Sequence, residues 1–177
     1  MTLVPFHRLA SLALAASLLA ACSPALDWRD VRADAAGLQM QFPCKPVQQQ
    51  RTVPLAGAPV VLTLRVCSAD GQTFGVADAD MFDPARVQAA LQELAAAAAR
   101  NIAGTPTRTA PLQLNGATPN DASQRQRLAG RLPDGKPAQM ELALFAIGTR
   151  VFQASVLGEK LNDETVEAFI GALHPTR

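Results

Sequence analysis

The chain has 177 residues, of which 49% are hydrophobic, with 16 Lys and Arg against 15 Asp and Glu. This length suits one domain with a sizeable core. The near-neutral charge, without a basic tract, argues against nucleic acid as a partner and against a surface held to anionic lipid by charge alone.

The first 21 residues predict a signal peptide. Arg8 precedes an apolar stretch, residues 9–21, which is shorter than the about 20 residues of a transmembrane helix. The segment Leu19-Ala20-Ala21-Cys22 resembles the lipobox of bacterial lipoproteins at all four positions. That resemblance implies cleavage before Cys22 and transfer of a diacylglycerol to its thiol, so that the mature protein carries palmitate-like acyl chains. The alternative is an ordinary secretory signal with a chance cysteine after the cut.

The resemblance also implies a location. In the lipoproteins that this chain resembles, Asp after the acylated cysteine retains the protein at the inner membrane, whereas this chain has Ser23. We therefore expect the periplasmic face of the outer membrane, with the inner membrane as the alternative. Two or three acyl chains hold a protein stably, whereas one chain binds marginally.

Cys44 and Cys67 remain as a pair once Cys22 is acylated. In an oxidising compartment such a pair predicts a disulfide. A redox pair or a thiolate metal site is the alternative. Redox pairs usually have the spacing C-x-x-C, and a metal site needs more Cys or His than this chain has, so we expect neither metal nor cofactor.

The first half of the mature chain predicts a tether, residues 22–37, followed by antiparallel strands. Leu38, Met40 and Phe42 alternate with glutamines, which indicates a half-buried strand that ends at Pro43. Three more strands are predicted at 48–55, 60–67 and 72–78, and Asp70-Gly71 is a strong hairpin signal between the last two.

A long amphipathic helix is predicted from the Asp83 cap and Pro84 to Gly104, because apolar residues recur there at helical spacing. The alanines of residues 95–99 keep this phase, which predicts close packing onto the sheet.

The second half predicts strands at 105–114, 124–132, 138–147 and 150–157, and a helix over 163–173 capped by Asn162. Residues 115–123 are predicted to form a mobile loop. The hairpin 138–157 is apolar on both faces, so we expect it in the middle of the sheet with a helix over each face. The fold class is thus α+β: one domain, 38–177, with an antiparallel sheet of about seven strands flanked by two helices.

This order of elements resembles the antiparallel sandwich shared by the PsbP protein of photosystem II and a nuclear Ran-binding import factor. The segment Phe42-Pro43-Cys44-Lys45-Pro46, with a second cysteine two strands later, resembles short uncharacterised bacterial lipoproteins. The resemblance implies a fold and no catalytic residues. Unbroken alternation would place Cys44 and Cys67 on conflicting faces of one sheet, so a bulge or the break at Pro43 has to reconcile them.

No catalytic set is expected. His174, the single histidine of the mature chain, stands beside Pro175 near the C-terminus, and no glycine-rich loop joins a strand to a helix. Asp78, Asp80 and Asp83 suggest calcium, but their spacing lacks the glycine and the ligand of a calcium loop, and a strand end with a helix cap explains them better.

Arg125, Arg127 and Arg131 alternate along one predicted strand, so their side chains project from one face. This pattern suggests an anion-binding stripe, with Arg108 as a further candidate member. The alternative is the solvated face of an edge strand. Acid/base chemistry by Glu141 or Asp134 has only isolated carboxylates to support it.

These observations favour a non-enzymatic module, anchored through Cys22, that presents a sheet face or residues 115–123 to another envelope protein. The alternative function is a carrier or sensor for a small anionic or lipid ligand held between sheet and helix.

Overall fold

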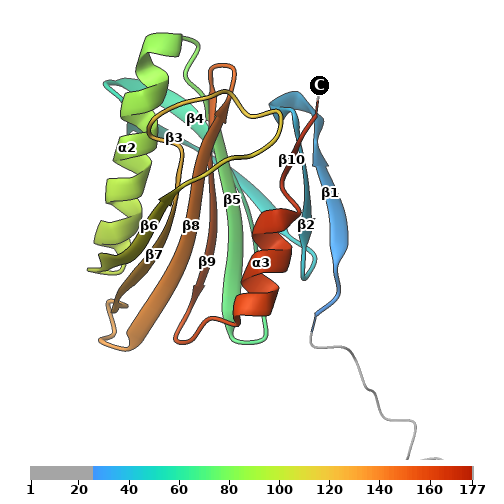
Figure 1. Cartoon of the computed structure of the whole chain (residues 1–177), viewed down its shortest axis with the longest axis vertical. Coiled ribbons are helices and arrows are strands. Elements are labelled where there is room, and N and C mark those ends of the chain that lie inside the picture. The colour runs from blue at the N-terminus through green and yellow to red at the C-terminus, as the bar shows by residue number, and fades with distance from the viewer. Residues whose placement is uncertain (1–25, 177) are drawn as a thin grey trace, which may run out of the picture.

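The computed structural model describes residues 26–176 and shows an α+β fold (Figure 1). The predicted signal peptide and Cys22 lie outside the described residues. Seven antiparallel strands form the main sheet, in the order β3-β4-β5-β9-β8-β7-β6. Their bounds are β3 Val47–Leu55, β4 Ala58–Ala69, β5 Gln72–Asp80, β6 Thr105–Pro111, β7 Gln124–Arg131, β8 Pro137–Ile147 and β9 Arg150–Gly158. None of the helices within residues 26–176 is both long and apolar enough to cross a membrane.

The hairpin of β8 and β9 lies at the centre of this sheet, as predicted, because both of its faces are covered. Leu142 and Leu144 belong to the core under helix α2, Pro84–Asn101. Ala143 and Phe145 belong to a second core on the opposite face, under helix α3, Asp163–Gly171. The prediction of an α+β sheet flanked by two helices is therefore confirmed (Figure 1).

Helix α2 begins as its sequence predicts, since the Asp83 side chain accepts a hydrogen bond of 2.9 Å from the backbone N–H of Ala85. The helix ends at Asn101, three residues before the predicted Gly104. Ala103 has a φ of 44°, and the N–H of Gly104 reaches back to the carbonyl of Ala99 at 2.8 Å. The alanine run packs on the sheet through Ala98, which is buried.

The strand Leu38–Phe42, labelled β2, does not belong to the main sheet, which corrects the expectation of a continuous meander. It forms a small separate sheet with β1, Arg29–Ala33, and β10, His174–Pro175. Residues within the expected tether 22–37 thus form β1 and a short 3₁₀ helix, Asp34–Ala36. The apolar residues of β1 are too few to predict a strand from the sequence. The strand is evident only from its pairing with β2.

The small sheet and α3 together cover the second core. The ring of Phe169 on α3 lies 5.3 Å from the ring of Phe42 on β2 and 5.3 Å from that of Phe74 on β5, edge-on in both cases. Such aromatic pairs stabilise a core beyond the area that they bury. The cluster joins all three elements.

The disulfide between Cys44 and Cys67 is present, as predicted. Cys44 follows β2 in the small sheet, whereas Cys67 lies on the face of β4 that borders the same core. Two facing sheets remove the conflict that a single sheet would create, so no bulge is needed. A bridge closing a loop with a sequence separation of 23 stabilises a fold by about 3 kcal/mol in the chain-entropy estimate.

Residues 115–123 are irregular, as predicted, but they are attached to the β8–β9 hairpin. The N–H of Thr118 donates to the carbonyl of Ala146 at 2.8 Å, and its hydroxyl accepts from the N–H of Gly148 at 2.7 Å. Leu112, Leu114 and Ala117 also pack against the second core. These contacts join the segment to residues distant in sequence, which its composition could not indicate; its mobility stays a prediction.

Candidate functional site

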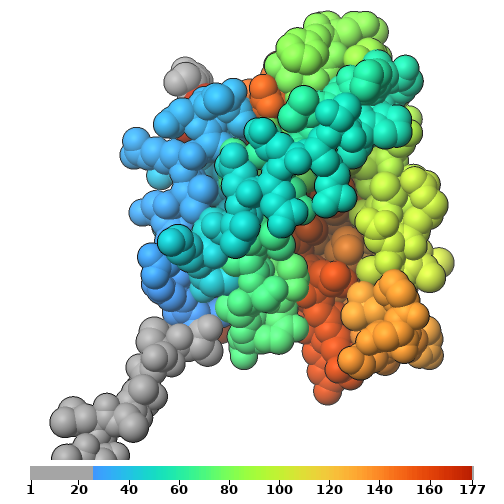
Figure 2. All heavy atoms as spheres, turned by 180° about the vertical axis from the view of Figure 1, so that it is seen from behind, coloured from blue at the N-terminus to red at the C-terminus, as the bar shows by residue number. Residues whose placement is uncertain are grey.

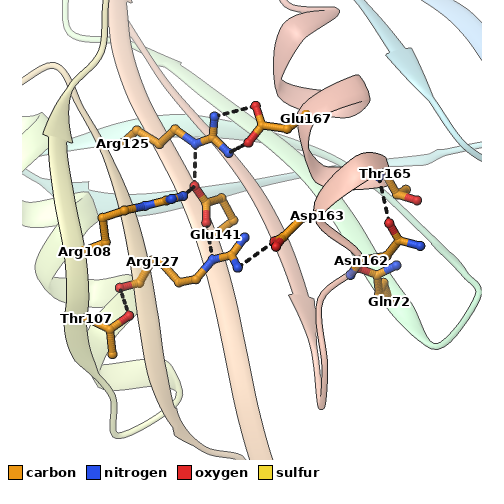
Figure 3. Close-up of polar contacts among 10 residues, drawn as sticks. All are labelled: Gln72, Thr107, Arg108, Arg125, Arg127, Glu141, Asn162, Asp163, Thr165 and Glu167. Carbon is orange, nitrogen blue, oxygen red and sulfur yellow. Dashed lines mark hydrogen bonds and ion pairs between the residues drawn. The ribbon is translucent and has the colours of Figure 1, made fainter.

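The predicted arginine stripe takes part in a compact group of charges on the α3 side of the sheet (Figure 3). We call this group the arginine–carboxylate cluster. The β7–β8 register places Arg127 directly opposite Glu141, and alternation puts Arg125 on the same face. Its members are Arg108 on β6, Arg125 and Arg127 on β7, Glu141 on β8, and Asp163 and Glu167 on α3.

Glu141 is the centre of the cluster, and its side chain is 0% exposed. One carboxylate oxygen accepts from Nε of Arg125 and, at 3.3 Å, from Nη2 of Arg108; the other accepts from Nε of Arg127 at 2.6 Å. A buried charge is tolerated only when it is paired and hydrogen-bonded. These guanidinium groups meet that requirement and occupy both oxygens.

The same two arginines join the sheet to helix α3. Arg125 donates two hydrogen bonds to the carboxylate of Glu167, at 2.9 and 2.7 Å, and Nη1 of Arg127 lies 2.7 Å from Asp163. An Arg–carboxylate pair joined by two hydrogen bonds fixes the relative orientation of the two groups and is also among the stronger hydrogen-bonded pairs in proteins. Each arginine therefore bridges a buried carboxylate below it and an exposed one above it.

These pairs shift the pKa values of their members. The hydrogen bonds from Arg125 lower the pKa of Glu167, although partial burial opposes the shift. The pKa of Arg125 rises through its bonds to Glu167 and, against the effect of burial, to Glu141. Burial also opposes the rise in the pKa of Arg127, but the bonds to Glu141 and Asp163 outweigh it.

The stripe is not continuous. Arg131 lies outside the cluster and donates to the carbonyl of Gly135 at 2.9 Å, within the turn between β7 and β8. Arg108 joins from the neighbouring strand, as the sequence suggested, and its side chain is 59% exposed. Three cations face three carboxylates in the cluster, so an added anion competes with the protein's own acidic groups.

The other acid/base candidate, Asp134, lies in the exposed turn after β7. Its carboxylate accepts from the backbone N–H of Lys136 at 3.1 Å and pairs with the Lys136 ammonium at 3.1 Å. Both contacts lower the pKa of Asp134. The structure does not bring Asp134 and Glu141 together, since they occupy a turn and the middle of a strand.

The three aspartates weighed for calcium take separate structural roles. Asp78, with a side chain 3% exposed, accepts from Nη1 of Arg65 at 2.7 Å and from Nη1 of Arg150 at 2.8 Å. Asp83 caps α2. Among residues 26–176, no group of three or more Asp, Glu, His and Cys side chains is arranged to hold a metal ion.

Asp80 is the last residue of β5, and its carboxylate fixes the backbone that follows the strand. It accepts from the backbone N–H of Phe82 at 2.8 Å and from the hydroxyl of Thr149 at 2.8 Å, and Nη2 of Arg150 lies 3.4 Å away. Burial raises the pKa of Asp80, but these three partners outweigh it, so the net shift is downward.

Phe82 is a residue that the sequence analysis missed. It has a φ of 59°, the residue is 83% exposed, and it lines a pocket of about 360 Å³ together with Val61, Gln48, Gln50 and Arg65. We call these five residues the Phe82 surface. A left-handed conformation is rare for a bulky residue, and the only sequence signal is an aromatic directly before a helix cap.

A comparison with known protein-family models finds no match for this chain, and a comparison with curated proteins finds none either. The contacts described above are therefore the basis for assigning a role.

Proposed function

We propose that this protein is a non-enzymatic binding or assembly module, anchored through acylated Cys22 to the periplasmic face of the outer membrane, which docks another envelope protein through the Phe82 surface. The lipobox-like sequence supports the anchor. The exposed, left-handed Phe82 carries the proposal for docking.

The left-handed conformation of Phe82 lowers the stability of the fold, which points to a role for this residue beyond folding. A non-glycine residue in this conformation costs about 1–3 kcal/mol, and such residues concentrate at binding sites. Because Phe82 is exposed, burial of its ring within the monomer contributes little to the free energy of folding. Aromatic anchors beside a pocket are typical of the residues that dominate interface energies.

The chemistry of the pocket defines the partner. Arg65 and Arg150 are balanced by Asp78 and Asp80, so the charged groups at its base sum to zero. Val61 is 56% exposed beside Phe82 and adds apolar surface at the rim. These features fit an uncharged polypeptide segment that inserts an apolar side chain between Val61 and Phe82.

The fold would present this surface away from the membrane. Strand β1 begins at the lower end of the domain, whereas the junction of β5 and α2, which contains Phe82, lies at the upper end (Figure 1). The segment from Cys22 to Arg29 spans at most about 25 Å when extended. An anchor at Cys22 would therefore hold the lower end near the bilayer.

The finer fold assignment belongs to the same proposal. A seven-stranded antiparallel sheet between α2 and α3 suits a PsbP-like sandwich, the family that the order of elements resembles. Proteins of one fold differ widely in function, so this assignment adds a shape and no activity.

The alternative role, a carrier or sensor for a small anionic or lipid ligand, has one observation in its favour. Arg108 is largely exposed and directs only one guanidinium nitrogen to Glu141 at 3.3 Å. Arg125 and Arg127 already donate hydrogen bonds to the protein's own carboxylates, so we rank this role second. A thermal-shift screen with inorganic phosphate and anionic lipid separates the roles, because only the carrier gains stability from these probes.

Crosslinking in cells tests the proposed docking. A photoreactive residue placed at Phe82 or Val61 should capture the same envelope protein, whereas one at Asp134 should not, because the β7–β8 turn that contains it lies at the opposite end of the domain (Figure 1). Phe82→Ala should abolish the adduct formed from position 61. Equal capture from Asp134, or an adduct that survives Phe82→Ala, would refute the docking surface.

Mass spectrometry of the mature protein tests the anchor. We expect an N-terminus at Cys22 bearing acyl chains, and release of Cys22→Ser from the membrane fraction. An unmodified Cys22 thiol would refute lipidation and leave the docking proposal to stand or fall by crosslinking.

A further inference from the structure

The two edges of the main sheet differ in their capacity to pair with another strand. At one edge, β6 contains Pro106 and Pro111 and has a register shift after Pro106. Proline lacks the N–H that a ladder needs, and bulges also discourage edge pairing. At the other edge, β3 runs for nine residues with β4 as its only neighbour among the described strands.

The β3 edge is open to solvent. Its first six residues are exposed, and the β3–β4 hairpin lies on the surface between β1–β2 and α2, as Figure 2 shows. Val47 is 61% exposed although it is a large apolar side chain. An edge strand with an exposed valine and a single charge, Arg51, is weakly protected against pairing.

The sequence of the β3 edge is nearly palindromic. Around Gln50, the segment 46–54 is Pro-Val-Gln-Gln-Gln-Arg-Thr-Val-Pro, so that proline corresponds to proline and valine to valine. We propose that β3 is a homodimer interface, in which two copies of the chain pair antiparallel about a two-fold axis at Gln50 and join their sheets into one.

Each pair in this register is chemically compatible. Val47 lies opposite Val53 of the second copy on the same face, which removes the exposed valine from water. Gln48 meets Thr52, and Gln49 meets Arg51, each pair occurring twice by symmetry. Moving the axis by one residue to Arg51 would oppose two like charges.

The flanking prolines limit the ladder to residues 47–53. About six to eight backbone hydrogen bonds form within this length, depending on which set of backbone groups faces outward. The contact is smaller than the about 1,200–2,000 Å² of a stable interface. We therefore expect a reversible dimer, whose population rises with concentration.

A pair of charge variants at one exposed position tests the register. Gln49→Glu introduces a carboxylate opposite Arg51 of the second copy, whereas Gln49→Lys introduces a like charge there. Sedimentation of the mature protein should show tighter association for Gln49→Glu and weaker association for Gln49→Lys, each by about 2- to 30-fold in Kd. Circular dichroism of both should match that of the parent, because Gln49 is exposed.

Cysteine crosslinking tests the position of the axis. Gln50→Cys places two thiols opposite each other, with Cα atoms about 4.5–5.5 Å apart, within the range of a disulfide. Gln48→Cys is the matched control, since the axis separates its two copies by about 13 Å. Gln50→Cys should give a reducible dimer linked through position 50, and Gln48→Cys should not.

Several results would overturn the proposal: a parent chain that stays monomeric up to millimolar concentration, equal crosslinking at positions 48 and 50, or association that ignores the sign of the charge at position 49. Phe82→Ala should leave the dimer unchanged. Gln48 and Gln50 belong to both surfaces, whereas Phe82 lies outside β3 and Gln49 lies outside the Phe82 surface, so the variants at positions 82 and 49 separate failure of the β3 interface from failure of the docking surface.

Discussion

Replacing Glu141 with glutamine should destabilise the protein substantially, although the two side chains have nearly the same shape. The change leaves Arg125 and Arg127 without the buried negative charge that they share. Removing one partner of a fully buried pair costs about 3–5 kcal/mol. Here both arginines retain some access to water and keep Glu167 and Asp163 as partners, so we expect a smaller loss of about 2–3 kcal/mol.

Thermal and urea unfolding measure this loss. For a domain of this size, about 1 kcal/mol corresponds to roughly 2–4 °C in Tm, so Glu141→Gln should lower Tm by roughly 4–12 °C. Asp163→Asn is the matched control, because the Asp163 side chain is 74% exposed and its ion pair should contribute less than about 1 kcal/mol. Equal effects of the two substitutions, or no effect of Glu141→Gln, would refute the idea that the buried carboxylate organises the cluster.

Three further predictions concern other parts of the fold. Replacing Cys44 and Cys67 together with serine should lower the free energy of unfolding by about 3 kcal/mol; an unchanged urea midpoint would contradict this. The folded-state pKa of Asp80 lies below its ordinary 3.8, so Asp80 stabilises the fold above that pH and the contribution disappears as pH falls through the lowered value. Asp80→Asn should therefore weaken the protein at neutral pH and flatten the acid limb of its stability below about pH 4, whereas parallel curves would refute the assignment. Phe82→Gly should leave stability unchanged or raise it by up to about 2 kcal/mol while abolishing partner capture, because glycine accepts the left-handed conformation freely; a large loss of stability would mean that the ring serves the fold.

Local patterns in the sequence predicted the elements whose determinants are adjacent residues. Asp83 and Pro84 specify the start of α2 because capping involves only the first helical turn. Apolar residues on both faces of β8 predicted its central place, since that pattern fits a strand covered twice. The Cys44–Cys67 disulfide was predicted from the cysteine count and from the expectation of an oxidising compartment, and the bridge is present.

The features that could not be predicted depend on contacts between distant segments. Val31 and Ala33 give β1 too short a signal, and its pairing with β2 is a tertiary fact. Alternation correctly placed Arg125 and Arg127 on one face of β7, although Arg131 lies outside the cluster. The pattern carried no information that α3 would bring Asp163 and Glu167 over these arginines. Phe82 is the exception, because the carboxylate that accepts a hydrogen bond from its backbone N–H belongs to Asp80, only two residues away.

The small sheet unites segments from near both ends of the chain, with His174 of β10 beside Gln39 of β2. Any process that delivers the polypeptide N-terminus first, ribosomal synthesis included, supplies β2 long before β10. The small sheet therefore gains its third strand only after residue 175 has been supplied, and α3, which covers the second core, also follows β2 by more than a hundred residues. A C-terminal extension that pulls on Pro175 should therefore weaken the packing of β2, which is distant in sequence. Removal of β10 by truncation should have the same effect.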